Sequence, residues 1–158
     1  MPTPAAGPTR STNEILETLR RALLDYENAN GDALRDTLGE NLWRNRAPDN
    51  QPFPYGTMRL STRNDGKYHG LRLEGKLEVQ IYGRPASQLE VLNDAADLCD
   101  QAMTFYVGAS AGGLMFTHAF QRDEMPPAGS PVDSETCTIR LVYSLAIWPA
   151  YLTNLTIA

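Results

Sequence analysis

Residues 71–81 read LRLEGKLEVQI, and this stretch decides the fold. Its odd-numbered positions are apolar apart from Gly75, whereas its even-numbered positions carry charged or amide side chains: Arg72, Glu74, Lys76, Glu78 and Gln80. Alternation with a period of two is typical of a strand with one buried and one exposed face. The pattern predicts a long strand over 68–82, in which Gly75 indicates a bulge or a bend.

Two further strands are predicted around this one. A partly apolar run over 57–62 is followed by the turn signal Asn64-Asp65-Gly66, so 57–62 and 68–82 are expected to form a hairpin. The same alternation returns over 137–147. Strands of about eleven residues exceed the usual length, so we expect them to twist strongly or to project toward a neighbouring subunit.

Two amphipathic helices accompany the strands. The first begins at Ser11, three residues before Glu14 in a capping-box spacing, and is expected to end at Asn30-Gly31. The second begins at Ser87 and is expected to cover Leu89–Tyr106, ending at Gly108.

Smaller elements are predicted between the helices and the long strands. A helical turn within 32–40 is expected to end at Gly39, and Leu42-Trp43-Arg44 favours a short strand. Alternation over 114–120 indicates another strand. It is followed by a long loop over Gln121–Glu135 that contains Pro126, Pro127 and Pro131.

These elements predict an α+β fold in the order α-β-β-α-β-β. Since each helix and each hairpin has one apolar face, the simplest arrangement is a two-layer sandwich: an antiparallel sheet with two helices packed on one face. A chain of 158 residues has the usual size of one domain. We expect a flexible arm over 1–10, a single domain over 11–148 and a tail over 149–158.

Composition excludes several classes of protein. The net charge is -5, which disfavours a protein whose main role is to wrap nucleic acid phosphates. Of the 14 basic residues only Lys67 and Lys76 are lysine, and arginine suits protein interfaces, although genomic base composition is the simpler explanation of the bias. No apolar run is long enough for a membrane span or a signal peptide, so synthesis in a cytosol is expected.

The residues that could carry chemistry do not form a recognisable set. His118 alternates with aromatic residues, and Cys99 and Cys137 lie on apolar faces, where a disulfide between them stays open. The glycine-rich tract 108–113 lacks the lysine of a phosphate loop. We expect water to solvate three carboxylates that are spaced three residues apart on the second helix: Asp94, Asp97 and Asp100. We therefore predict no enzyme, and no catalytic, cofactor-binding or metal site.

The functional signal is architectural instead. A long loop in a compact domain tends to be functional, and the polar face of the strand over 68–82 is a candidate contact surface. We expect the loop to contact an axial neighbour, and the polar strand face to lie near subunit contacts or a lumen. The candidate interaction residues are Arg72, Glu74, Lys76, Glu78, Arg122, Asp123, Glu124, Met125 and Asp133.

The layout over residues 11–148 resembles the bacteriophage tail terminator (tail completion, minor tail protein U-like) family. The resemblance rests on an N-terminal amphipathic helix leading to Leu42-Trp43, and on Pro52-Phe53-Pro54-Tyr55 followed at once by a strand. It also rests on the strand Leu77–Gly83 and on the Asp/Ala-rich helix Leu89–Tyr106. A strand, a loop and a last strand close the pattern.

This resemblance implies a structural virion protein without enzymatic activity or cofactor. Members form a hexameric ring at the tail–neck junction, which caps the tail tube, ends its polymerisation and provides the surface for head attachment. The implied partners are other copies of the chain, the tail tube protein and the neck or head–tail connector proteins. Genomic DNA passes through the lumen without specific binding, a role that an acidic chain suits.

Three other interpretations stay open at this stage. One is another neck protein, such as a head–tail stopper or adaptor. A second is a small α+β enzyme or ligand-binding domain with a pocket between helix and sheet, in which His118, Tyr143 and Asp97 are the residues to test. The third is a dimeric interaction module without a phage context.

Overall fold

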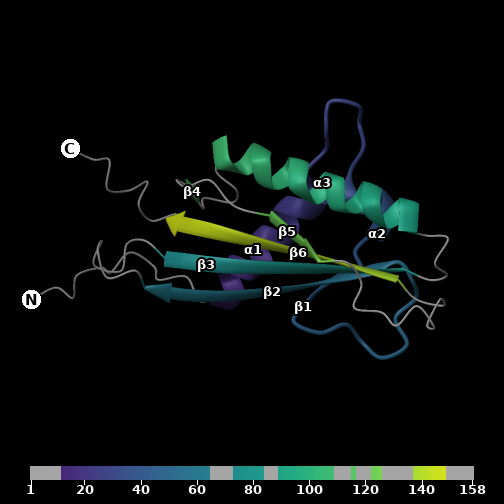
Figure 1. Ribbon diagram of the computed structural model, residues 1–158, viewed down its shortest axis with the longest axis horizontal. Coiled ribbons are helices and arrows are strands. Elements are labelled where there is room, and N and C mark those ends of the chain that lie inside the picture. The colour runs from purple at the N-terminus through teal and green to yellow at the C-terminus, as the bar shows by residue number, and fades with distance from the viewer. Residues whose placement is uncertain are drawn as a thin grey trace, which may run out of the picture.

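A computed structural model describes residues 12–64, 73–83, 89–108, 115–116, 122–125 and 137–148. The chain is α+β, as the sequence indicates (Figure 1). Its elements follow the order α1 (Thr12–Asp25), α2 (Leu34–Leu38), β1 (Leu42–Arg44), β2 (Tyr55–Asn64), β3 (Leu73–Gly83), α3 (Leu89–Gly108), β4 (Met115–Phe116), β5 (Arg122–Met125) and β6 (Cys137–Trp148).

The strands form one six-stranded sheet in the order β1-β2-β3-β6-β4, and β5 pairs with β6 beside this path. The predicted hairpin of β2 and β3 is confirmed, because the two strands pair antiparallel along their whole lengths. β6 lies antiparallel on the other side of β3. The prediction of a purely antiparallel sheet is wrong at β1, which pairs parallel with β2. The loop over 45–54 returns the chain to the start of the sheet, so β2 runs in the same direction as β1.

The predicted order α-β-β-α-β-β is also wrong. The helical turn and the short strand expected before residue 45 are separate elements, α2 and β1, that the order omitted. Within the segment predicted as a long loop, Arg122–Met125 form β5, because their backbone pairs antiparallel with β6. Of the strand predicted over 114–120, the described part is β4, which pairs with the end of β6.

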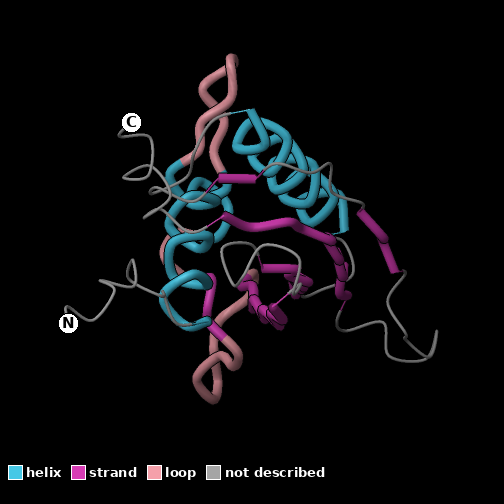
Figure 2. The backbone as a smooth tube through the Cα atoms, turned by 90° about the vertical axis from the view of Figure 1, so that its left-hand side faces the viewer, coloured by secondary structure: helices cyan, strands magenta, loops and turns pink. Residues whose placement is uncertain are grey.

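One face of the sheet carries the core. The odd-numbered residues of β3 from Gly75 onward and of β6 from Ile139 onward are buried together with the apolar sides of α1, α2 and α3, and Figure 2 shows the helices on the same side of the curved sheet. The fully buried side chains include Ile15, Leu19, Leu34, Leu77, Val79, Ile81, Leu92, Cys99, Met103, Leu141, Tyr143 and Ile147. The burial pattern of β3 alternates from Gly75 onward, as its sequence predicts.

Gly75 does not mark a bulge. The register continues one-to-one through this residue on both sides, with Thr62 on β2 and Leu145 on β6. A Cβ atom at Gly75 would lie 2.8 Å from Cδ1 of Ile147 and 3.5 Å from Cδ1 of Leu60. The glycine therefore leaves room for two apolar side chains of the core.

The first helix ends at Asp25, earlier than the predicted Asn30-Gly31. The side-chain oxygen of Asn28 accepts hydrogen bonds from the backbone N–H groups of Asn30 and Asp32, each 2.9 Å long. Such local bonds offer the backbone an alternative to the helix. Gly31 then takes a left-handed conformation with φ of 82°, so the chain turns back on itself instead of continuing the helix.

The second helix of the fold ends as predicted at Gly39, whose φ is 61°. Arg35 of α2 ties this helix to the end of α1, because its guanidinium donates to Asp25 at 2.6 Å and also contacts Glu40. Across the described residues, no helix combines the length and the apolar character that a membrane crossing needs.

Candidate assembly surface

The second face of β2, β3 and β6 is the open face of the sheet. In the described part of the chain, the helices bury their apolar residues only on the opposite side. Because paired residues share a face, the register sets Tyr55 beside Tyr82, Thr57 beside Gln80, and Arg59 beside Glu78. On β6, Arg140 pairs with Gln80. The open face is thus a polar and aromatic surface three strands wide.

Glu78 lies at the centre of a hydrogen-bonded network on this face. Its carboxylate accepts a bond of 2.6 Å from Nη2 of Arg140 and one of 2.7 Å from Nε2 of Gln80. The hydroxyl of Tyr82 donates in turn to Oε1 of Gln80. The side chain of Glu78 is only 19% exposed, although it lies on the open face. The network fixes four polar side chains before any partner binds.

The charges around Glu78 shift its pKa. Burial tends to raise the pKa, but hydrogen bonds from Arg140 and Gln80 outweigh that effect, helped by the positive charges of Arg140 and Arg59. The pKa of Glu78 therefore lies below its ordinary value, and the residue is a carboxylate at neutral pH. Burial raises the pKa of the Tyr55 hydroxyl, and the neighbouring Tyr82 adds to the effect, so Tyr55 keeps its proton.

An aromatic groove of about 510 Å³ lies at one end of the open face. Tyr55 and Tyr82 stack with ring centroids 4.8 Å apart, and Phe53 packs on Tyr55 at 5.3 Å. The other walls are mainly polar and come from the loop after β1 and from β2 and β3: Asn45, Arg46, Ala47, Pro48, Asp49, Asn50, Gln51, Thr57, Arg59 and Gln80. Amide and guanidinium groups on an aromatic base suit a polar peptide segment.

A second groove, of about 720 Å³, lies where β2, β3 and β6 approach the other end of the face. Arg63 and Glu74 form an ion pair across its floor, with Nη2 and Oε2 2.5 Å apart. Lys76 also lines the groove, together with Ser61 and Ser144. Both grooves are lined by β2 and β3, and β6 contributes only to the second.

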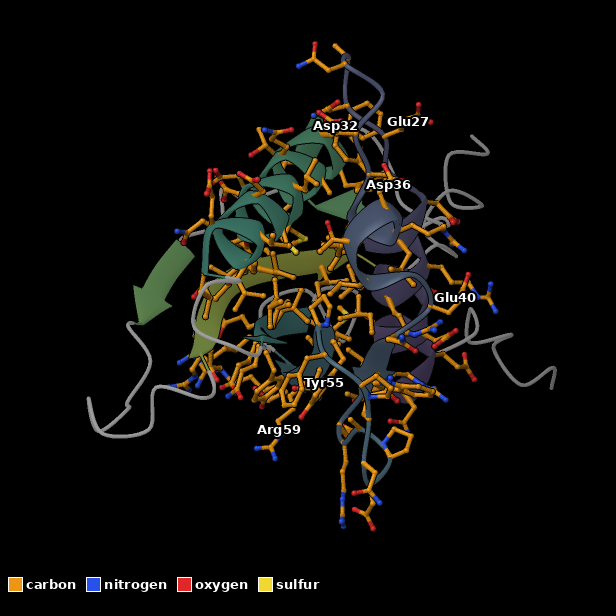
Figure 3. All side chains as sticks on the ribbon, turned by 90° about the vertical axis from the view of Figure 1, so that its right-hand side faces the viewer. Glu27, Asp32, Asp36, Glu40, Tyr55 and Arg59 are labelled. Carbon is orange, nitrogen blue, oxygen red and sulfur yellow. The ribbon has the colours of Figure 1, made fainter. Side chains whose placement is uncertain are left out.

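The opposite end of the molecule is acidic. The loop between α1 and α2, residues 26–33, projects away from the sheet and is called the acidic loop below, because it carries Glu27 and Asp32 and no basic residue. Figure 3 places these two carboxylates, with Asp36, at one end of the molecule and Tyr55 and Arg59 at the other.

The predicted interaction residues lie in different parts of the chain. Glu74, Lys76 and Glu78 lie together on the open face, with Lys76 exposed and the two carboxylates half-buried. Arg122, Asp123, Glu124 and Met125 form β5, so they belong to a strand rather than to the expected loop. Arg72 and Asp133 lie outside the described residues.

Two of the three residues proposed for a pocket between helix and sheet are described. Tyr143 is fully buried within the core, whereas Asp97 is exposed on α3; His118 lies outside the described residues. Cys99 is buried in the core, and the side chain of Cys137 lies outside the described set. In the parts of the chain that the structure describes, no group of three or more His, Cys, Asp or Glu could hold a metal ion.

The interaction residues predicted from the sequence omit several side chains of the open face. Arg140, Arg59 and the stacked Tyr55 and Tyr82 belong to the same surface as Glu78. The alternation over 137–147 places Arg140 on the polar side of its strand, so a signal was present. The ion pair of Arg140 with Glu78 depends on the register between β3 and β6. These strands are far apart in the sequence, so no local pattern contains that register.

Comparison with known proteins adds no relative. The scan against protein-family models finds no match, and the search of curated proteins finds no significant similarity.

Proposed function

We propose that this chain is a ring-forming subunit that caps a bacteriophage tail tube, as a tail terminator does. The observation that carries the proposal is the open face of the sheet, on which Arg140 and Tyr82 are pre-arranged by the network around Glu78. Arginine and aromatic residues are enriched where protein surfaces meet. The resemblance in layout over residues 11–148 supplies the phage context.

The proposed fold of the assembled subunit is the two-layer sandwich, with the helices on one side of the sheet and neighbouring subunits on the other. Separating a half-buried ion pair such as Glu78–Arg140 would leave a partly desolvated charge without its partner. The pair therefore favours one arrangement of the side chains on the open face. A rigid surface suits a ring whose subunits must keep one geometry. The ring is not an enzyme and needs no cofactor or metal.

The mechanism is geometric. One side of the ring resembles a ring of the tube, so it docks on the last one, while the other side does not, so growth ends. The second side then accepts the neck or head–tail connector proteins, and genomic DNA passes through the lumen without specific binding. The location is the tail–neck junction of the virion, after synthesis in the host cytoplasm.

The test is negative-stain imaging of the full-length chain mixed with tail tubes assembled from the tube protein of the same genome. We expect rings at one end of each tube and tubes that no longer lengthen when more tube protein is added. Tubes that grow equally with and without the chain would refute the proposed function. A dimer that never meets the tubes would favour the dimeric interaction module.

A deletion tests the axial contact separately. The deletion covers residues 126–133 and leaves β5 intact, because Arg122–Met125 pair with β6. We expect this variant to keep its fold and to form rings that no longer join heads to tails. Circular dichroism and imaging check the two halves of that expectation, and infectious particles from the deletion would contradict the axial role.

A further inference from the structure

We propose that the acidic loop of one copy docks into the aromatic groove of the next copy, so that the chain associates head to tail. This inference rests on the proposed function only in taking the chain to assemble with itself. It names the two mating surfaces, and neither surface belongs to the core.

The acidic loop has the properties of an inserted element. It is held in one conformation by the two bonds to the side chain of Asn28 and by a bridge between Glu27 and Ala33. Arg35 holds its base through Asp25. A segment that is already ordered loses little conformational entropy when it binds. Its tip, Asn28 to Gly31, is small and polar, so it suits a groove lined by amides.

The aromatic groove has the complementary charge. Arg59 is exposed and forms no ion pair in the described part of the chain, while Arg46 pairs with Asp49 at 3.1 Å on the surface. The residues that line the groove thus carry two cations and one carboxylate, with Glu78 beside Arg59 in the register, whereas the acidic loop carries two carboxylates and no cation. Opposite charges of this kind steer association and select the register of the contact.

The positions of the two surfaces decide the type of assembly. The loop over 26–33 and the loop over 45–54, which borders the groove, project in opposite directions in both Figure 1 and Figure 2. Contacts between two different patches at opposite ends are heterologous, and they give a closed ring when the rotation between copies closes. A second copy of the chain is therefore the occupant that the molecule itself supplies.

Nucleic acid fits the groove less well. Its two arginines face one aspartate, so the positive charge is too small to neutralise several phosphates. The test distinguishes the two occupants, because self-association measured without nucleic acid depends only on the protein surfaces.

The experiment compares charge-reversed variants of the full-length chain by sedimentation velocity over a concentration series up to about 1 mM. The loop variant carries Glu27→Lys and Asp32→Lys, and the groove variant carries Arg46→Glu and Arg59→Glu. Asp94→Lys on α3 is the matched control, because it reverses an exposed carboxylate outside both surfaces. Thermal unfolding confirms that each variant folds.

We expect the loop variant and the groove variant each to associate at least about tenfold more weakly than the wild type. An equimolar mixture of the two should recover association, because every contact in it can pair opposite charges. The control should behave like the wild type. Wild-type chain that stays monomeric throughout, or reversals that leave association unchanged, would overturn the inference.

The two proposals fail in different ways. Reversed variants that assemble normally and still cap tubes would refute the head-to-tail contact and leave the proposed function standing. Wild-type chain whose association depends on both surfaces but which never caps a tube would refute the proposed function alone.

Discussion

The two faces of β3 differ in what holds them. On one face Leu77, Val79 and Ile81 are fully buried under the helices; on the other Lys76 is exposed and Glu78 is held by hydrogen bonds. The buried face gains its free energy from apolar area removed from water, whereas the open face gains little from charged groups that stay partly solvated. The buried side of the strand therefore stabilises the fold, and we propose that its open side serves assembly.

The largest expected effect comes from the buried face. Leu77→Ala removes a fully buried side chain and leaves a cavity beneath the helices, so we expect it to lower the free energy of unfolding by about 2–5 kcal/mol. Urea titration measures the loss. Lys76→Ala, one residue away on the open face, is the matched control. An equal loss in both variants would show that the two faces do not differ.

A moderate effect is expected at Gly75, where side chains of the buried face pack closely against the backbone. Gly75→Ala adds a methyl group 2.8 Å from Cδ1 of Ile147, and we expect a loss of about 1–3 kcal/mol from overpacking. Ile147→Val removes that Cδ1 atom, so the double variant should be more stable than the sum of the two single changes predicts. Additive losses in this double-mutant cycle would contradict the proposed contact.

A smaller effect is expected from the open-face network. Arg140→Ala should lower the free energy of unfolding by about 1 kcal/mol at neutral pH, because Glu78 loses its ion pair. Since the folded-state pKa of Glu78 is lowered, its contribution is complete above the ordinary pKa and is lost as pH falls through the folded pKa. The difference between wild type and Glu78→Gln should therefore shrink below about pH 4.

The smallest effect on stability is expected at Lys76, an exposed residue of the open face. Lys76 is exposed and makes no ion pair in the described part of the chain, so Lys76→Glu should change the free energy of unfolding by less than about 0.5 kcal/mol. If the open face meets a neighbour, the same change should weaken ring formation. A large change in stability with unchanged assembly would reverse the assignment of the two faces.

Much of the fold is predictable because the period of the apolar residues is a local signal. Alternation located the end of β3 and both ends of β6 to within about one residue, and helical spacing located α3; residues 68–72 of the predicted strand lie outside the described residues. The end of α1 was misplaced because the bonds made by Asn28 depend on a turn that the apolar pattern does not contain.

The features that sequence patterns did not predict depend on contacts between distant segments. The parallel pairing of β1 depends on the path of the loop over 45–54, and β5 depends on its pairing with β6. Glu78 could be singled out from its position on a polar strand face, but its partner Arg140 could not be named. Surfaces formed across strands are therefore the part that sequence patterns locate least well.

The most direct test of the account is the mass of the assembled full-length chain, measured by native mass spectrometry. We expect a closed hexamer of the 17.5 kDa subunit, which the groove variant loses and its mixture with the loop variant recovers. A monomer alone, or an open series of masses without a preferred size, would contradict it.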